Sequence, residues 1–133
     1  MSYQRLAAGV LFLMLAVPAM AAETIEVYDN HGGSVVQYNK RWAGLAARGV
    51  NVKIVGPCQS ACTVLLGHIP RGRICVTPNA SFGFHLAKKS HATDILRKSY
   101  QSDIRAWIAK YGGLTEQFIW LRAPEIYRYF KKC

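Results

Sequence analysis

Apolar and polar positions alternate along the 133-residue chain in a way that predicts strands and helices in turn. Residues 24–28 are rich in β-forming types and lead into a turn with the Gly32-Gly33 pair. After the capping residue Ser34, apolar side chains recur at three- and four-residue steps until Gly49, as in an amphipathic helix closed by glycine. By the same criteria we expect strands at residues 50–55, 73–76 and 81–85, and helices at residues 60–66, 93–111 and 116–121.

This alternation indicates an α/β fold with a mostly parallel sheet and right-handed crossover helices. Before it, residues 1–21 have the three parts of a secretory signal peptide: a positive start, an apolar run to Val17 and the A-x-A site Ala19-Met20-Ala21. The run is too short and too early for a stable membrane span. We therefore expect cleavage near Ala21, a single α/β domain over residues 22–133, and a periplasmic or secreted protein.

The chain is strongly basic, with 17 Lys and Arg against seven Asp and Glu and a formal charge of +10. A hydrophobic content of 51% excludes intrinsic disorder. The spread of positive charge indicates either a solvated surface or attraction to an anionic envelope polymer or lipid surface. An exported chain without a nucleic-acid-binding motif is not expected to bind nucleic acid. Because no zinc, P-loop or dinucleotide motif occurs, we expect no metal and no cofactor.

The four cysteines form an even set, and in an oxidising compartment disulfides are expected. Four cysteines allow three pairings, among which the spacing alone does not choose. We favour Cys58–Cys62 together with Cys75–Cys133, and a Cys58–Cys75 bridge is the nearest alternative.

The segment from Gly56 to Cys62 carries the most informative motif. Ser60 follows a buried-type strand and opens a helix, which is where a sharp turn exposes a nucleophilic hydroxyl beside free N–H groups. The flanking Cys58 and Cys62 are small, as such a turn requires, and a bond between them would lock it. The alternative interpretation is that Ser60 is only a helix cap.

Two further features belong with Ser60. The glycine pair can present the N–H of Gly33 to a developing oxyanion, beside the N–H of Ala61. His85 ends a strand in an apolar setting and could take the proton from Ser60. Without function, the histidine would be a packed core residue and the glycines an ordinary turn.

The order of these motifs resembles the proteolytic subunit of the Clp protease, in the Clp protease/crotonase-like superfamily, over about residues 23–129. The motifs that carry the resemblance are a strand ending in Gly-Gly, Gly-x-x-x-Ser at residues 56–60, the Pro78-Asn79 turn and a strand ending at His85. The resemblance implies a Clp-like α/β fold and a peptide or protein substrate. It also implies roles for four residues: Ser60 as nucleophile, His85 as base, and Gly33 and Ala61 as oxyanion donors.

The acid of a Ser-His-acid triad is also assigned through the resemblance. Carrying the family's register forward reaches Glu125, where the family usually has aspartate, and Glu116 is the alternative. If neither has this role, both are solvated carboxylates.

The chain departs from the family pattern because the first strand–helix unit is missing, so we expect a fold truncated at that unit. With the expected export, this argues against an ATPase partner and leaves homo-oligomers open. The chain is similar to an exported, cysteine-containing branch of Clp-like proteins. Two hypotheses follow: an ATP-independent periplasmic serine hydrolase, most simply a peptidase, or a catalytically inactive Clp-like binding or stress-related envelope protein.

Overall fold

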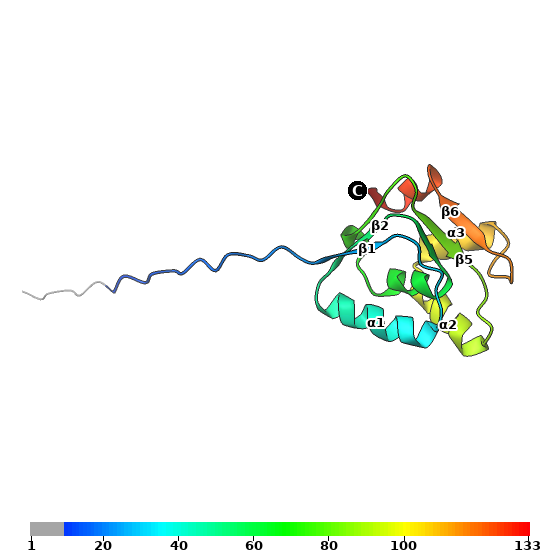
Figure 1. Ribbon diagram of the computed structural model, residues 1–133, viewed down its shortest axis with the longest axis horizontal. Coiled ribbons are helices and arrows are strands. Elements are labelled where there is room, and N and C mark those ends of the chain that lie inside the picture. Colours follow the sequence, from blue (N-terminus) through cyan, green and yellow to red (C-terminus); the bar gives the residue numbers. More distant parts are fainter. Residues whose placement is uncertain (1–9) are drawn as a thin grey trace, which may run out of the picture.

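The computed structural model describes residues 10–133. Residues 10–23 have neither helix nor strand and extend away from the body of the molecule (Figure 1). The expected signal peptide starts in residues 1–9, which lie outside the described residues, so its cleavage stays a prediction. Among the helices formed by residues 10–133, none combines the length and apolarity that a bilayer span requires.

Within the described residues the strands form two small sheets. The first sheet is entirely parallel, in the order β1-β2-β4-β7. The second has the order β3-β5-β6, in which β3 and β5 are parallel and β6 is antiparallel to β5. The predicted α/β class with mostly parallel pairing is confirmed. The strands are β1 (Thr24–Val27), β2 (Asn51–Ile54), β3 (Pro57–Gln59), β4 (Ile74–Val76), β5 (Ser81–Phe84), β6 (Ile119–Arg122) and β7 (Lys131–Lys132).

Helix α1 (Val35–Ala47) forms where the apolar spacing predicted it. The Ser34 hydroxyl oxygen accepts a hydrogen bond from the Gln37 amide at 3.3 Å, which satisfies one of the free N–H groups of the first turn. The helix ends before Gly49, whose φ of 70° suits glycine. Trp42 and Leu45 are buried on the inner face, so α1 is held by its apolar stripe.

The next helical segment along the chain, η1 (Ser60–Gly67), contacts both α1 and α2 (Ser90–Ser99). It was predicted as a helix from residue 60, and it winds as a 3₁₀ helix with i→i+3 bonds. Its residues 61–66 are all buried, so it forms the centre of the helical layer. Figure 1 shows α1 and α2 together on one side of the molecule.

The prediction of one long helix over residues 93–111 is wrong. The segment consists of α2 and a separate α3 (Ser102–Lys110), and Tyr100 and Gln101 between them have extended backbone angles. Tyr100 is buried, and its hydroxyl lies 2.6 Å from the Thr63 hydroxyl oxygen. A hydrogen bond that must be made inside the core therefore overrides the helical periodicity at this position.

The predicted helix at residues 116–121 is also wrong, because residues 119–122 form strand β6. Its partner β5 pairs with it from Ser81↔Arg122 to Phe84↔Ile119. β5 is buried throughout and needs a neighbour for its backbone groups, which β6 supplies. The short β3 was not predicted as a strand either. Two short 3₁₀ turns, η2 (Arg71–Arg73) and η3 (Glu125–Arg128), complete the structure.

The favoured disulfide pairing is confirmed. Cys58 and Cys62 are bonded across the β3–η1 junction, with their Cα atoms 5.4 Å apart. Cys75 in β4 is bonded to Cys133 beside β7, with a Cα–Cα distance of 4.8 Å. The first bridge therefore fixes a local turn, and the second attaches the C-terminal segment to the parallel sheet.

The two bridges should contribute unequally to stability. Replacing Cys75 and Cys133 by alanine opens a loop of sequence separation 58 and should lower the free energy of unfolding by about 4 kcal/mol. The Cys58→Ala/Cys62→Ala pair opens a loop of separation 4 and should cost about 2 kcal/mol. Urea unfolding of both variants measures this, and a smaller loss for the longer loop would contradict it.

Candidate active site

Ser60 stands at the turn between β3 and η1, with a φ of 54°. This left-handed conformation is unfavourable for any residue with a Cβ atom, and Ser60 is the one non-glycine residue of the described chain that adopts it. The turn is held from both sides, because the fully buried Cys58 and Cys62 are bonded to each other. A strained, covalently bracketed serine is typical of a functional position.

A buried hydrogen-bond relay fixes the Ser60 backbone. The Thr63 hydroxyl donates to the Ser60 carbonyl oxygen at 2.6 Å. Since that donation uses the only hydroxyl proton of Thr63, the Tyr100 hydroxyl must donate to the Thr63 oxygen. Burial raises the pKa of Tyr100, which keeps the phenol protonated and able to donate. The Tyr100 break between α2 and α3 thus supports the serine turn.

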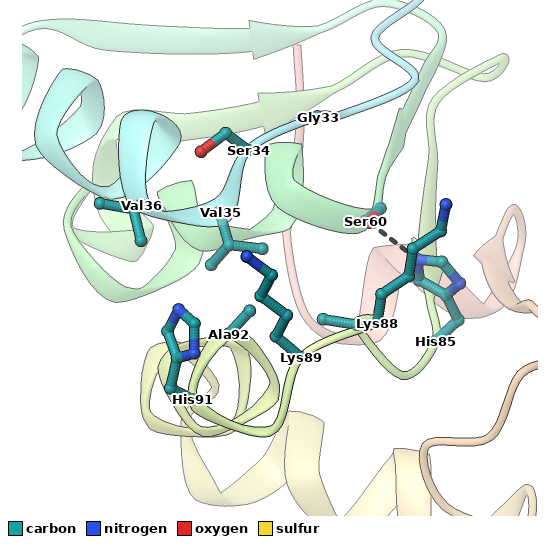
Figure 2. Close-up of a pocket in the computed structure, with 11 residues that line it drawn as sticks. Gly33, Ser34, Val35, Val36, Ser60, His85, Lys88, Lys89, His91 and Ala92 are labelled. Carbon is teal, nitrogen blue, oxygen red and sulfur yellow. Dashed lines mark hydrogen bonds between the residues drawn. The ribbon is translucent and has the colours of Figure 1, made fainter.

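His85 lies next to Ser60 because the two residues follow neighbouring parallel strands. In the β3–β5 pair, Gln59 is in register with Gly83, so both strands end at the same edge of the sheet. The Nε2 atom of His85 lies 2.7 Å from the Oγ atom of Ser60, a short hydrogen-bond distance (Figure 2). The predicted nucleophile and base are therefore in direct contact.

Phe118 packs against one face of the His85 ring, whose Nε2 edge contacts Ser60. The two rings are stacked, with centroids 4.0 Å apart and planes 16° from parallel. Partial burial lowers the pKa of His85 below its ordinary value, because desolvation disfavours the imidazolium. The imidazole is therefore neutral near pH 7, the form that accepts a proton.

The glycine pair approaches the serine turn closely. A Cβ atom on Gly32, which has a φ of 81°, would lie 2.9 Å from the Ala61 amide nitrogen, so only glycine fits. The Gly32 amide is occupied, since it donates to the Asn30 side-chain oxygen at 3.0 Å. By contrast, the amides of Gly33 and Ala61 donate to no backbone carbonyl within the described chain. The predicted oxyanion donors thus flank Ser60 with free N–H groups.

Ser60, His85 and Gly33 open onto a cleft of about 540 Å³. In Figure 2 the Ser60–His85 pair lies at one end, and the start of α2 lies across from the start of α1. Ser60, His85 and Gly33 line the cleft together, whereas Ala61 is buried behind Ser60. The other lining residues are Ser34, Val35, Val36, Ala87, Lys88, Lys89, His91 and Ala92.

The structure does not bring the predicted acid to His85. Glu125 follows Arg122, which pairs with Ser81 at the start of β5, whereas His85 follows the end of that strand. Glu125 and His85 therefore follow opposite ends of β5, and a strand of this length spans roughly 13 Å at about 3.3 Å per residue. The Glu125 carboxylate instead accepts from the Tyr111 hydroxyl at 3.4 Å.

The alternative acid, Glu116, does not contact His85 either. It is exposed two residues before Phe118, and it makes no ion pair among the residues that the structure describes. None of the described carboxylates lies within ion-pair distance of His85. The same part of the chain holds no group of three or more His, Cys, Asp or Glu side chains suited to a metal ion.

Sequence reasoning missed several supporting residues: Phe118, the Tyr100–Thr63 relay and Asn30. Phe118 was missed because residues 116–121 were predicted to be a helix. The run of aromatic and β-branched residues that begins at Phe118 favours a strand and could have revealed it. The relay joins residues 37 positions apart, and no local pattern predicts such a contact.

Comparison with protein families and curated proteins gives no match for this chain. Among solved structures it is similar to a protein described as an enzyme, at a TM-score of 0.53, 14% identity, and coverage of 81% of this chain and 73% of that one. A peptidase from Plasmodium falciparum matches at a TM-score of 0.50, 14% identity, and coverage of 81% and 74%. A point mutant of ClpP1 from Listeria monocytogenes matches at a TM-score of 0.48, 21% identity, and coverage of 82% and 71%.

At these identities the likeness shows the fold alone. The chain has a mixed α/β fold, with a mostly parallel sheet and packed helices, similar to that of the enzyme and the peptidase matched at TM-scores of 0.53 and 0.50. This confirms the predicted α/β class with a mostly parallel sheet. Membership of an exported branch stays a prediction.

The positive φ of Ser60 predicts an unusual order of stability for two variants. Ser60→Gly and Ser60→Ala both lose the hydroxyl, but only glycine adopts φ 54° without a steric penalty. The glycine variant should therefore have a free energy of unfolding about 1 kcal/mol higher than the alanine variant. Urea denaturation compares them, and an alanine variant of equal or higher stability would argue against a left-handed Ser60.

Proposed function

We propose that this protein is a serine hydrolase of the peptidase type, with Ser60 as nucleophile and His85 as general base. The observation that carries the proposal is the 2.7 Å contact between Ser60 Oγ and His85 Nε2 at the mouth of a cleft. A nucleophile within hydrogen-bond reach of a neutral base is the arrangement that nucleophilic catalysis requires.

The reaction follows from this geometry. As Ser60 Oγ attacks the scissile carbonyl carbon, its proton passes to His85 Nε2, and the carbonyl oxygen becomes an oxyanion. The N–H groups of Gly33 and Ala61 stabilise that charge. The tetrahedral intermediate then breaks its C–N bond, and His85 returns the proton to the leaving amine. A water molecule, deprotonated by His85, hydrolyses the acyl-enzyme and regenerates Ser60.

We infer that the pair works as a dyad rather than as the triad expected from sequence. Neither Glu125 nor Glu116 contacts His85, and the stacked Phe118 ring restrains the imidazole plane instead. Without a carboxylate the imidazolium that forms is stabilised less, so we expect slower turnover than a complete triad would give.

The cellular location in which the proposed activity takes place is also a proposal. The signal-peptide pattern and the two disulfides favour an exported, periplasmic or secreted enzyme. In such a compartment we expect ATP-independent action on peptides or proteins. Attraction to anionic envelope polymers or lipid surfaces is a secondary proposal supported by the basic charge. Self-assembly is a further proposal, which rests on the resemblance of the sequence motifs to the Clp protease.

A fluorophosphonate probe tests the proposal directly, because it reacts with a serine that a neighbouring base has activated. The oxidised wild-type protein should be labelled, and Ser60→Ala should abolish labelling. His85→Ala should slow it by about 100-fold or more, the usual contribution of a general base. The rate is measured by intact-protein mass spectrometry.

Two matched variants sharpen this test. Glu125→Gln should label within about twofold of wild type, because its carboxylate does not reach His85. Phe118→Leu removes the stacked ring and should slow labelling while Ser60 and His85 are kept. If folded, oxidised wild type resists labelling, the activity proposal fails and the binding or stress-related envelope protein becomes the better hypothesis.

The lowered pKa of His85 sets the pH dependence. His85 accepts the proton only when neutral, so the labelling rate should be constant at high pH and fall as the ring becomes protonated. Because burial lowers this pKa, the rate should reach half its maximum below about pH 6.5, the ordinary histidine value. The His68→Gln variant, altered away from the pair, should keep the same midpoint. A midpoint well above 6.5 would contradict the account.

A further inference from the structure

The cleft wall that faces the Ser60–His85 pair is basic. It is formed by the segment that enters α2, and it carries the exposed side chains of Lys88, Lys89 and His91. Figure 2 shows the Lys89 ammonium group extending from this segment toward Val35 on the opposite wall, and Lys88 lying beside the pair. Two permanent positive charges therefore border the place where a substrate carbonyl would sit.

No carboxylate of the described chain neutralises these charges. The lining of the cleft includes no Asp or Glu. The ion pairs found in residues 10–133 lie elsewhere, and their cations are His31, Arg48, Lys53, Arg71 and Arg97. The charge of the cleft is thus left for a ligand or for solvent ions.

The backbone adds to the same sign of potential. Helix α1 begins at Val35 and helix α2 at Ser90, so both N-termini lie at the cleft. Neither helix has an acidic residue in its first turn. The free N–H groups there carry partial positive charge, which favours an anion. The lysine side chains and the helix N-termini therefore both make the cleft electrostatically positive.

The cleft also has an apolar part suited to a short aliphatic stem. Val35 is buried, and Val36, Ala87 and Ala92 extend this surface between the two helix starts. A side chain made of methylene groups ending in a carboxylate would place its stem here and its charge beside Lys88 and Lys89. A purely apolar side chain would leave both charges unmatched.

We propose that this cleft recognises peptide segments that carry a carboxylate next to the bond to be cleaved. The inference rests on the proposed hydrolase function and specifies its substrate class. The carboxylate has two sources in peptides, an acidic side chain or the free C-terminus, and both present the same group to the lysines.

The test measures how peptides slow fluorophosphonate labelling of the oxidised wild-type protein. Three hexapeptides differ only in charge: a central glutamate with an amidated C-terminus, a central glutamine with an amidated C-terminus, and a central glutamine with a free C-terminus. At low salt a carboxylate peptide should halve the labelling rate at about one-tenth the concentration that the uncharged peptide needs. The better competitor of the two charged peptides identifies the carboxylate source.

Charge-matched variants separate this site from the general basicity of the chain. Lys88→Gln/Lys89→Gln should reduce the tenfold preference to about twofold or less, as should 1 M salt, which shortens the screening length to about 3 Å. Lys40→Gln/Arg41→Gln removes the same charge from exposed residues of α1 that do not line the cleft. This control should keep the full preference.

The outcomes distinguish the two proposals. If wild type is labelled and all three peptides compete equally, or no peptide competes, the carboxylate preference is wrong while the proposed hydrolase function is still supported. A preference that persists in Lys88→Gln/Lys89→Gln would also overturn it. Absence of labelling would remove the hydrolase, and this inference with it.

Discussion

The parallel pairing of β3 with β5 is the interaction on which the site depends. It places the residues that follow Gln59 and Phe84 at one edge of a sheet, so a serine and a histidine 25 positions apart come within 2.7 Å. β3 has only three residues, and its contacts are reinforced on both sides. The Cys58–Cys62 bond closes the turn after it, and Asn30 forms an isolated parallel β-bridge with Cys58 inside the strand. A short strand can therefore position a strained turn that its own hydrogen bonds would hold weakly.

Much of the fold was predictable because it is encoded locally. The apolar spacing and the glycine stop of α1 and the β-rich runs of β1, β2 and β4 all agree with the structure. The favoured disulfide pairing also agrees, although Cys75 and Cys133 are 58 positions apart and no local pattern selects their bond. The two wrong helix predictions, over residues 93–111 and 116–121, have a common physical cause. At Tyr100 a buried hydroxyl must reach Thr63, and at residues 119–122 the buried strand β5 needs a partner. Both demands come from distant residues, so local periodicity gave the wrong element.

In the candidate site, too, the residues in local motifs were identified from the sequence and those that depend on distant contacts were not. Ser60, His85 and Gly33 were predicted from motifs, and the structure brings them to one cleft. The acid was assigned by carrying a family register through residues 113–125, where this chain forms β6. The antiparallel run of that strand takes Glu125 to the opposite end of β5 from His85. Phe118, near the start of the same strand, supports the histidine instead. For the proposed hydrolase, a site with the predicted nucleophile and base but without the acid predicts slower turnover than a complete triad would give.

The direction of the Ser60–His85 hydrogen bond is the central claim, because only a serine that donates can be activated by the histidine. ¹⁵N chemical shifts of the His85 ring measure it, with Ser60→Ala as reference. At pH 8 the account predicts a neutral ring with its proton on Nδ1 and an unprotonated, hydrogen-bonded Nε2 whose shift changes in the variant. A ring protonated at Nε2, donating to Ser60, would contradict the account, since Nε2, the atom in contact with Ser60, would then have no free electron pair to accept the serine proton.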